Sequence, residues 1–177
     1  GNLVVGQSGG CTAVMNTSLV GVIHEALQQP GIEGIYGARH GIQGILEGWL
    51  VDLRRERPET LEGLRSTPSA ALGSCRYPLR EEDYERALGV LRAHNVRYFI
   101  YIGGNDSADT SHRLASLAEA SGYEMRVVGV PKTIDNDLPI TDHCPGYGSI
   151  ARFVATATRD AGRDTEAMHQ VDPVKII

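Results

Sequence analysis

A short charged segment carries the residues best suited to chemistry. Residues 131–137, Pro-Lys-Thr-Ile-Asp-Asn-Asp, place two carboxylates and an ammonium group within seven positions. The apolar run of residues 125–130 precedes them and is typical of a buried strand, so the charges begin where the strand reaches the edge of its sheet. In an extended segment the carboxylates of Asp135 and Asp137 project to one side, as metal binding or proton transfer requires. A polar turn is the alternative, because Asp-Asn-Asp is also common in turns.

Two glycine-rich loops also follow strand-like runs. Residues 6–12, Gly-Gln-Ser-Gly-Gly-Cys-Thr, come after the apolar residues 3–5, and residues 103–107, Gly-Gly-Asn-Asp-Ser, come after residues 98–102. Each loop precedes an amphipathic helical pattern, and glycines before a helix let backbone N–H groups approach an anion. One such loop is weak support, because any tight turn can require glycine. Two of them, together with residues 131–137, indicate a phosphate-binding site.

A hydrolase is an alternative that the first loop raises. Residues 6–10 satisfy the G-x-S-x-G pattern of a nucleophile elbow. Such an elbow needs earlier strands to supply its oxyanion loop, and only five residues precede Gly6. The six histidines show no metal-ligand spacing, and His143 alone lies near the expected site. We therefore disfavour a hydrolase or a zinc enzyme.

Composition and hydrophobic patterning define the expected fold class. The 177 residues are 41% hydrophobic and 22% charged, enough for one α/β core. Short apolar runs alternate with amphipathic helical stretches, which predicts a mostly parallel sheet flanked by helices. Further short strands are expected at residues 34–37 and 50–52. Further helices are expected around residues 84–91 and 150–157.

Net charge, apolar runs and cysteine spacing limit the partners and the location that we expect. A net charge of −5 and a pI near 5.7 argue against nucleic acid or an anionic membrane as a partner. No apolar run is long enough for a membrane span or a signal peptide, so a cytoplasmic protein is expected. Cys11, Cys75 and Cys144 lack a C-x-x-C spacing and are expected to be reduced thiols.

The chain resembles the phosphofructokinase family over essentially its whole length. Five spaced motifs in the family's order carry the resemblance. They are Ser-Gly-Gly at 8–10 with Met-Asn at 15–16, Gly-Ser-Cys-Arg at 73–76, the loop 103–107, the segment 131–137, and Thr-Asp-His at 141–143 leading to Pro-Gly-Tyr-Gly at 145–148.

The resemblance implies a division of the chain. Residues 1–146 would form the lobe that binds the phosphoryl donor, and residues 147–177 would begin the sugar-phosphate lobe. Residues 174–177 are typical of a strand whose return helix is missing, so the chain is expected to be truncated, with its sugar-phosphate clamp beyond Ile177. Members of the family assemble as homodimers or homotetramers, which the resemblance makes the expectation here.

The resemblance also assigns roles in phosphoryl transfer to fructose 6-phosphate. Asp135 would remove the proton of the 1-hydroxyl group, Asp137 would hold the geometry or help position a metal, and Arg76 would stabilise the transferring phosphoryl group. Thr133 would bind the substrate together with Asp135, and its hydroxyl would act in catalysis as a further donor to the transferring phosphoryl group. Backbone N–H groups near Gly10 and Gly104 would contact the donor.

Asp106 and Lys132 bear on the identity of the donor. ATP-dependent members of the family typically carry glycine at both positions, which leaves room for the α-phosphate. A carboxylate at Asp106 would repel that phosphate, whereas Lys132 would pair with pyrophosphate, so the chain resembles the pyrophosphate-dependent branch. An ATP-dependent kinase and a non-catalytic sugar-phosphate sensor remain the alternatives. Asn105 stands where many members carry an acidic residue associated with Mg²⁺, so the metal role is expected to pass to Asp106.

Overall fold

The computed structural model describes residues 1–171 and 173–176. Its centre is a five-stranded sheet of order β3-β2-β1-β4-β5. The strands are β1 (Asn2–Gln7), β2 (Ile35–Ala38), β3 (Leu50–Asp52), β4 (Val96–Gly103) and β5 (Arg126–Pro131). Strand β1 pairs in parallel with β2 and β4, and β4 pairs in parallel with β5, while β3 is antiparallel to β2. The expected mostly parallel α/β sheet is confirmed.

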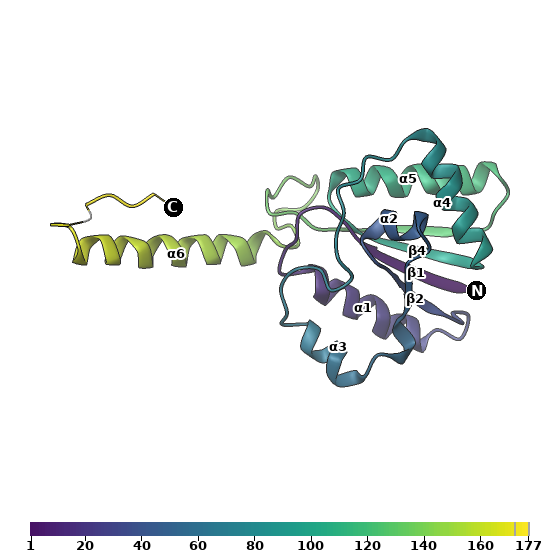
Figure 1. The fold of residues 1–177 in the computed structure, drawn as a ribbon, viewed down its shortest axis with the longest axis horizontal. Coiled ribbons are helices and arrows are strands. Elements are labelled where there is room, and N and C mark those ends of the chain that lie inside the picture. Colours follow the sequence, from purple (N-terminus) through teal and green to yellow (C-terminus); the bar gives the residue numbers. More distant parts are fainter. Residues whose placement is uncertain (172, 177) are drawn as a thin grey trace.

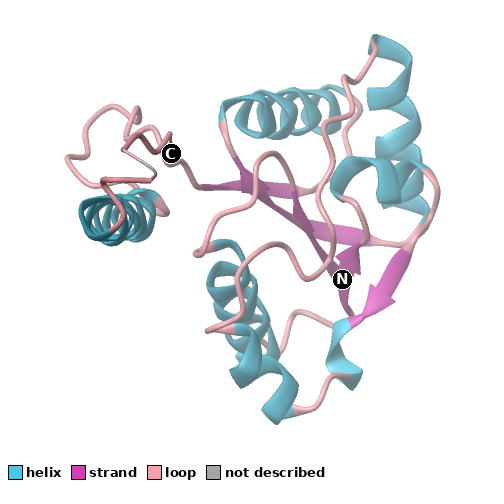
Figure 2. Cartoon of the chain, turned by 60° about the vertical axis from the view of Figure 1, so that its left-hand side comes forward, coloured by secondary structure: helices cyan, strands magenta, loops and turns pink. Residues whose placement is uncertain are grey.

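Helices cover both faces of the sheet (Figures 1 and 2). Helices α2 (Gly41–Leu46), α4 (Glu81–Ala93) and α5 (Asn105–Ala120) lie on one side, and α1 (Met15–Gln28) and α3 (Pro58–Leu64) lie on the other. A 3₁₀ turn, η1 (Leu53–Arg55), follows β3. Alternate strand residues point to opposite faces, so Val4 belongs to the core under α2, α4 and α5, while Leu3 and Val5 pack against α1.

Local sequence explains where several helices begin. Helix α4 starts with three acidic residues in its first turn, and the Asp83 carboxylate accepts a hydrogen bond from the Arg80 N–H at 2.9 Å. Acidic groups there are favourable because they satisfy free N–H groups and face the positive end of the helix dipole. Helix α3 starts with Pro58, whose fixed φ suits the first helical position.

Two expectations about strands are wrong. Strand β5 was expected to be buried, but none of its residues is, because in the described part of the chain β4 is the only strand that pairs with it and β5 forms the edge of the sheet. Residues 174–176 form no strand: they have no neighbouring strand, and the Lys175 ammonium instead pairs with Asp164. The last residue of that expected strand, Ile177, lies outside the described residues.

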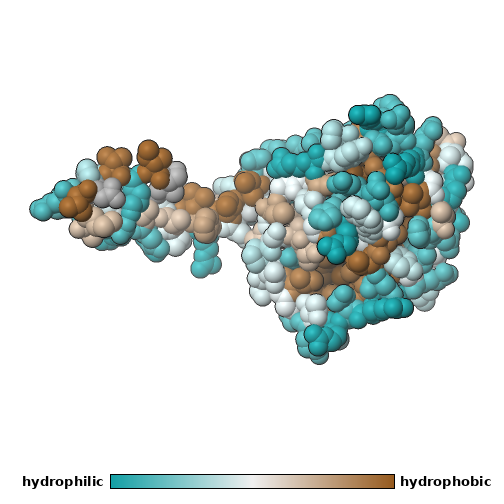
Figure 3. All heavy atoms as spheres, viewed as in Figure 1, coloured by the Kyte–Doolittle hydropathy of each residue, from teal (hydrophilic) through white to brown (hydrophobic). Residues whose placement is uncertain are grey.

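Helix α6 (Tyr147–Ala167) stands apart from these layers and projects away from the sheet (Figure 1). It begins directly after residue 146, the expected lobe boundary. None of its residues is buried, and Phe153 and Val154 are 67% and 53% exposed. Figure 3 shows apolar atoms along this helix. Across the described residues, no helix combines the length and apolar character that crossing a bilayer requires.

Candidate functional site

Three loops meet at one edge of the sheet because the strands that precede them are parallel neighbours. Strands β1, β4 and β5 end at Gln7, Gly103 and Pro131, and β1 is the strand at which the chain order reverses. Open α/β sheets bind ligands at such a place. A cavity of about 260 Å³ lies there. Its lining consists of Gly10, Cys11, Thr12, Arg76, Gly104, Asn105, Lys132, Thr133, Ile134, Asp135 and Asp137.

The carboxylates of Asp135 and Asp137 differ in their hydrogen bonding. The Thr133 hydroxyl donates to Asp137 Oδ1 at 2.9 Å, and the Asn105 amide donates to Asp137 Oδ2 at 3.4 Å. The Asp135 N–H donates to Thr133 Oγ1 at 3.0 Å, whereas the Asp135 carboxylate accepts no hydrogen bond from a described residue. Asp137 is therefore held in place, and the Asp135 carboxylate is available to take a proton.

The segment leaves β5 at Pro131 and bends at residues 134–135, so it is not the extended strand end that the spacing predicts. Asn136 has a φ of 55°, and its side-chain oxygen accepts a hydrogen bond from the Cys144 N–H at 2.9 Å. Asparagine tolerates this left-handed conformation, and its side chain closes the turn. Strand alternation therefore does not orient Asp135 and Asp137, although both line the cavity.

Lys132 is the buried cation of the site. Its side chain belongs to a residue that is only 7% exposed, and its ammonium forms no hydrogen bond or ion pair with any described residue. Burial lowers the pKa of Lys132; the nearby Arg76 lowers it further, while Cys11 and Asp135 raise it. The side chain is largely removed from water while its ammonium lines the cavity without a partner, so this ammonium is poised for an anionic ligand.

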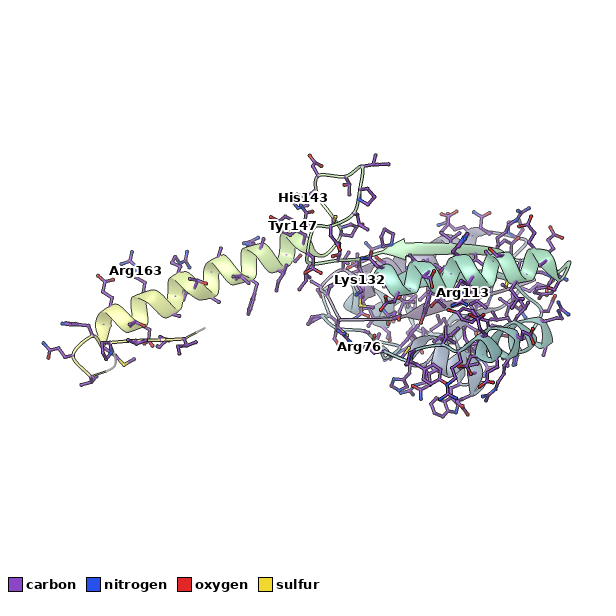
Figure 4. All side chains as sticks on the ribbon, turned by 90° about the horizontal axis from the view of Figure 1, so that it is seen from above. Arg76, Arg113, Lys132, His143, Tyr147 and Arg163 are labelled. Atoms are coloured by element: carbon purple, nitrogen blue, oxygen red, sulfur yellow. The ribbon has the colours of Figure 1, made fainter. Side chains whose placement is uncertain are left out.

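Arg76 lies on the same side of the molecule as Lys132, at the end from which α6 leaves (Figure 4). The Arg76 side chain is exposed and makes no hydrogen bond or ion pair within the described residues. Its Nη2 atom lies 3.3 Å from the point where a Cβ on Gly10 would stand. Gly10 therefore leaves room for the guanidinium group beside the loop.

Backbone donors complete the positive side of the cavity. Within the part of the chain that the structure describes, the N–H groups of Gly10 and Gly104 have no hydrogen-bond partner. The hydroxyl oxygen of Thr12 is buried and also lacks one. Buried polar groups normally find partners, so unpaired donors beside two unpaired cations favour a ligand rich in oxygen. Cys11, Thr12 and Ile134 also line the cavity, and no pattern in the sequence marks these three as site residues.

Three other residues considered from the sequence lie outside this cavity. Asp106 is exposed on the first turn of α5 and does not line it; Asn105 does. His143 is exposed and packs edge-on against Tyr147, with ring centroids 5.4 Å apart. The Ser8 hydroxyl donates to the Cys75 carbonyl at 3.5 Å, and no histidine among the described residues bonds to it, which leaves the hydrolase alternative without a triad.

The oxygen atoms at the site fit a hard cation. Asn105, Asp135 and Asp137 contribute amide and carboxylate oxygens, the ligands that Mg²⁺ prefers, usually completed by water and substrate phosphates. In the described residues no cluster of three or more His, Cys, Asp or Glu side chains forms a metal site of its own. The donor set therefore suits a metal that arrives with a phosphate ligand.

Comparison with known proteins identifies the family. The sequence profile named phosphofructokinase matches residues 2–177. The chain belongs to the phosphofructokinase family. It is 50% identical over 173 residues to a pyrophosphate--fructose 6-phosphate 1-phosphotransferase of Xanthomonas campestris, a match that covers 95% of this chain and 41% of that protein. It thus spans about two fifths of that relative's length.

Solved structures and ATP-dependent relatives refine the comparison. The crystal structure titled pyrophosphate-dependent phosphofructokinase from Nitrosospira multiformis matches with a TM-score of 0.89 and 47% identity, over 96% of this chain and 43% of that one. An ATP-dependent 6-phosphofructokinase of Clostridium acetobutylicum is 31% identical over 170 residues, which is 95% of this chain and 50% of that protein. Within the phosphofructokinase family, the chain is more similar to these pyrophosphate-dependent members than to this ATP-dependent one.

Proposed function

We propose that the protein carrying this chain transfers a phosphoryl group from pyrophosphate to the 1-hydroxyl group of fructose 6-phosphate, which gives fructose 1,6-bisphosphate in glycolysis. The observation that carries the proposal is the unpaired ammonium of the largely buried Lys132, which lines a cavity of about 260 Å³ together with residues of two glycine-rich loops. A compact polyanion supplies the charge that this ammonium lacks. The names of the similar proteins from Xanthomonas campestris and Nitrosospira multiformis support this donor.

The residues at the site suggest how the transfer proceeds. Asp135, whose carboxylate accepts no hydrogen bond from a described residue, takes the proton as the sugar oxygen attacks the terminal phosphorus. The new bond joins that oxygen to phosphorus, the bridging P–O bond breaks, and orthophosphate leaves. Arg76 and the N–H groups of Gly10 and Gly104 face the charge that develops on the phosphoryl oxygens. Thr133 fixes Asp137 and binds the sugar phosphate beside Asp135.

Mg²⁺ is the proposed cofactor. Asn105 and Asp137 would hold it from the cavity lining, with the exposed Asp106 carboxylate as the further ligand predicted from the sequence. When bound, Mg²⁺ neutralises negative charge on the phosphate oxygens and orients them. The Thr133 hydroxyl, which donates to Asp137 Oδ1 at 2.9 Å, holds this carboxylate at the cavity.

We also propose how the protein is divided into lobes, how it assembles and where in the cell it acts. We assign residues 1–146 to the donor lobe and residues 147–177 to the beginning of the sugar-phosphate lobe, since α6 leaves the sheet at Tyr147. A homodimer or homotetramer acting in the cytoplasm is the proposed setting, without nucleic acid or membrane partners. These proposals rest on the family and on composition.

The direct test compares donors. We would measure kcat/KM for pyrophosphate and for ATP with fructose 6-phosphate as acceptor, on the full-length protein at fixed free Mg²⁺. Preference for pyrophosphate is the expected result, and preference for ATP would overturn the proposed donor. A sensor would bind both ligands in calorimetry without turnover, so tight binding with no product would favour that alternative.

A further inference from the structure

A buried pair of amide side chains lies beneath the loop that carries Arg76. Gln7, the last residue of β1, is 0% exposed, and Asn16, in the first turn of α1, is 1% exposed. The Gln7 amide nitrogen donates to the Met15 carbonyl at 3.1 Å and to Asn16 Oδ1 at 3.2 Å. A polar pair this deeply buried is costly unless its hydrogen bonds are made, and these are.

The remaining bonds of the pair hold the main chain of residues 67–72. Gln7 Oε1 accepts the Leu72 N–H at 2.9 Å. Asn16 Oδ1 accepts the Ala71 N–H at 2.8 Å, and the Asn16 amide donates to the Thr67 carbonyl at 2.9 Å. The segment has no regular secondary structure of its own at these residues, so the two amides replace the bonds that a helix or strand would supply.

A second set of hydrogen bonds joins residues 74–75 to the glycine-rich loop of residues 6–12. The Ser74 hydroxyl donates to the Gly9 carbonyl at 2.6 Å, and the Gly9 N–H donates to the Cys75 carbonyl at 3.1 Å. Between the two sets of hydrogen bonds lies Gly73, with a φ of 76°; a Cβ there would stand 2.5 Å from His40 Nδ1. The path from residue 67 to residue 75 is thus fixed by bonds that do not involve Arg76.

Arg76 itself has no such bonds. Its exposed side chain makes no hydrogen bond or ion pair within the described residues, so its position before a ligand binds is set by the backbone that precedes it. We propose, on the basis of the proposed function, that Gln7 and Ser74 are positioning residues that aim Arg76 at the transferring phosphoryl group. Misplacement of a charged group by about 1 Å is enough to cost about a hundredfold in rate.

A double-mutant cycle tests this role on the full-length protein. Gln7→Met keeps the approximate volume but removes three hydrogen bonds, and Ser74→Ala removes only the bond to Gly9. Each is made alone and together with Arg76→Ala. Both single changes should lower kcat about tenfold or more and leave KM for fructose 6-phosphate within about twofold. In the Arg76→Ala background, neither should lower kcat further, because the group that they aim is gone.

Controls separate positioning from general destabilisation. Leu91→Ala, in the core on the opposite face of the sheet, is a matched destabilising change that should lower the melting temperature and spare kcat. Ser74→Ala keeps the inference testable if Gln7→Met does not fold. Equal loss of kcat with and without Arg76 would overturn the inference and leave the proposed function standing. A wild type that uses only ATP would overturn the proposed donor, and the cycle is then scored with ATP.

Discussion

The Lys132 ammonium nitrogen lies 3.0 Å from the point where a Cβ on Gly9 would stand. Gly9 has a φ of +77°, a conformation that other residues adopt only with strain. The same glycine carbonyl accepts the Ser74 hydroxyl at 2.6 Å. Gly9 thus lies beside the Lys132 ammonium and is hydrogen-bonded to Ser74, in the loop that carries Arg76.

Gly9→Ala should therefore damage donor binding. Left-handed backbone costs an alanine about 1–2 kcal/mol, and the new methyl group would also press on the Lys132 ammonium, which must shift slightly to make room. We expect a lower melting temperature and a loss of about ten- to a hundredfold in kcat/KM for pyrophosphate, the worth of a charge-assisted contact. Gly89→Ala is the matched control, because Gly89 lies in α4 with ordinary φ and nothing within 4 Å of its added Cβ. Unchanged pyrophosphate kinetics in Gly9→Ala would contradict this account.

Activity with pyrophosphate should fall at alkaline pH because of Lys132. Burial lowers the pKa of this ammonium, so it loses its proton, and its attraction for a phosphate oxygen, at a pH below that of an ordinary lysine. We expect kcat/KM for pyrophosphate to decline as pH rises through this lowered pKa. Lys132→Arg keeps its charge at all accessible pH values and should lack that decline. The measurement is a pH profile of kcat/KM for both proteins, and parallel alkaline limbs would assign the decline to another group.

The same pKa has a consequence for stability with the opposite sign. Between the lowered pKa in the folded state and the ordinary lysine pKa of about 10.5, the unfolded chain binds more protons than the folded one. The free energy of unfolding therefore rises with pH over that window. Lys132→Met should flatten this rise. Denaturant unfolding of the two proteins without ligands, across that pH range, provides the comparison.

The place where the loops meet could be predicted from the sequence, because it depends on strand order. Residues 3–5 and 98–102 are apolar and precede glycines, so their strands and the meeting of their loops followed from the rule that parallel strands bind ligands at their carboxyl ends. The short helix α2 was not predicted. It begins after His40, which has a φ of 56° and provides no side-chain cap, so no residue pattern marks its start.

Burial and hydrogen bonding that depend on residues distant in sequence could not be predicted from the local residue pattern. The burial of an apolar strand such as β5 depends on which elements pair with its edges and cover its faces, and its own residues do not encode that. The turn at Asn136 depends on a bond to the Cys144 N–H, eight residues away. The orphaned Thr12 hydroxyl and the pairing of Gln7 with Asn16 likewise become visible only once the loops are packed together.

Asp135 and Asp137 should differ when each is changed to asparagine. The Asp135 carboxylate has no hydrogen-bond donor among the described residues, so Asp135→Asn should keep the fold and donor binding yet lower kcat by about 10²–10⁴-fold. Asp137 accepts bonds from Thr133 and Asn105, so Asp137→Asn disturbs the turn and should also lower affinity for Mg²⁺. We would measure kcat and the Mg²⁺ dependence of both variants in full-length protein. A loss below tenfold in Asp135→Asn would move the base to Asp137.

Donor choice should depend on Asp106 and Lys132 together. Asp106 stands exposed on the first turn of α5, next to the cavity-lining Asn105, where its carboxylate would oppose the α-phosphate of ATP. Asp106→Gly should admit ATP by removing bulk and charge, and it should also cost pyrophosphate activity if this carboxylate helps to hold Mg²⁺. Lys132→Gly should chiefly harm pyrophosphate use, by about ten- to a hundredfold, because it removes the buried cation.

The double variant is the decisive member of this series. Asp106→Gly should improve the binding of ATP, and Lys132→Gly should weaken the binding of pyrophosphate. Both changes therefore raise the ratio of kcat/KM for ATP over pyrophosphate, and together they should raise it further. We would measure that ratio for the wild type, both single variants and the double variant at fixed free Mg²⁺. Gly104 offers a control: a Cβ added there would stand 3.8 Å from the Lys132 ammonium nitrogen, an ordinary van der Waals contact, so Gly104→Ala should leave the ammonium in place and should not admit ATP. A double variant whose ratio equals that of the wild type would show that these two side chains do not select the donor.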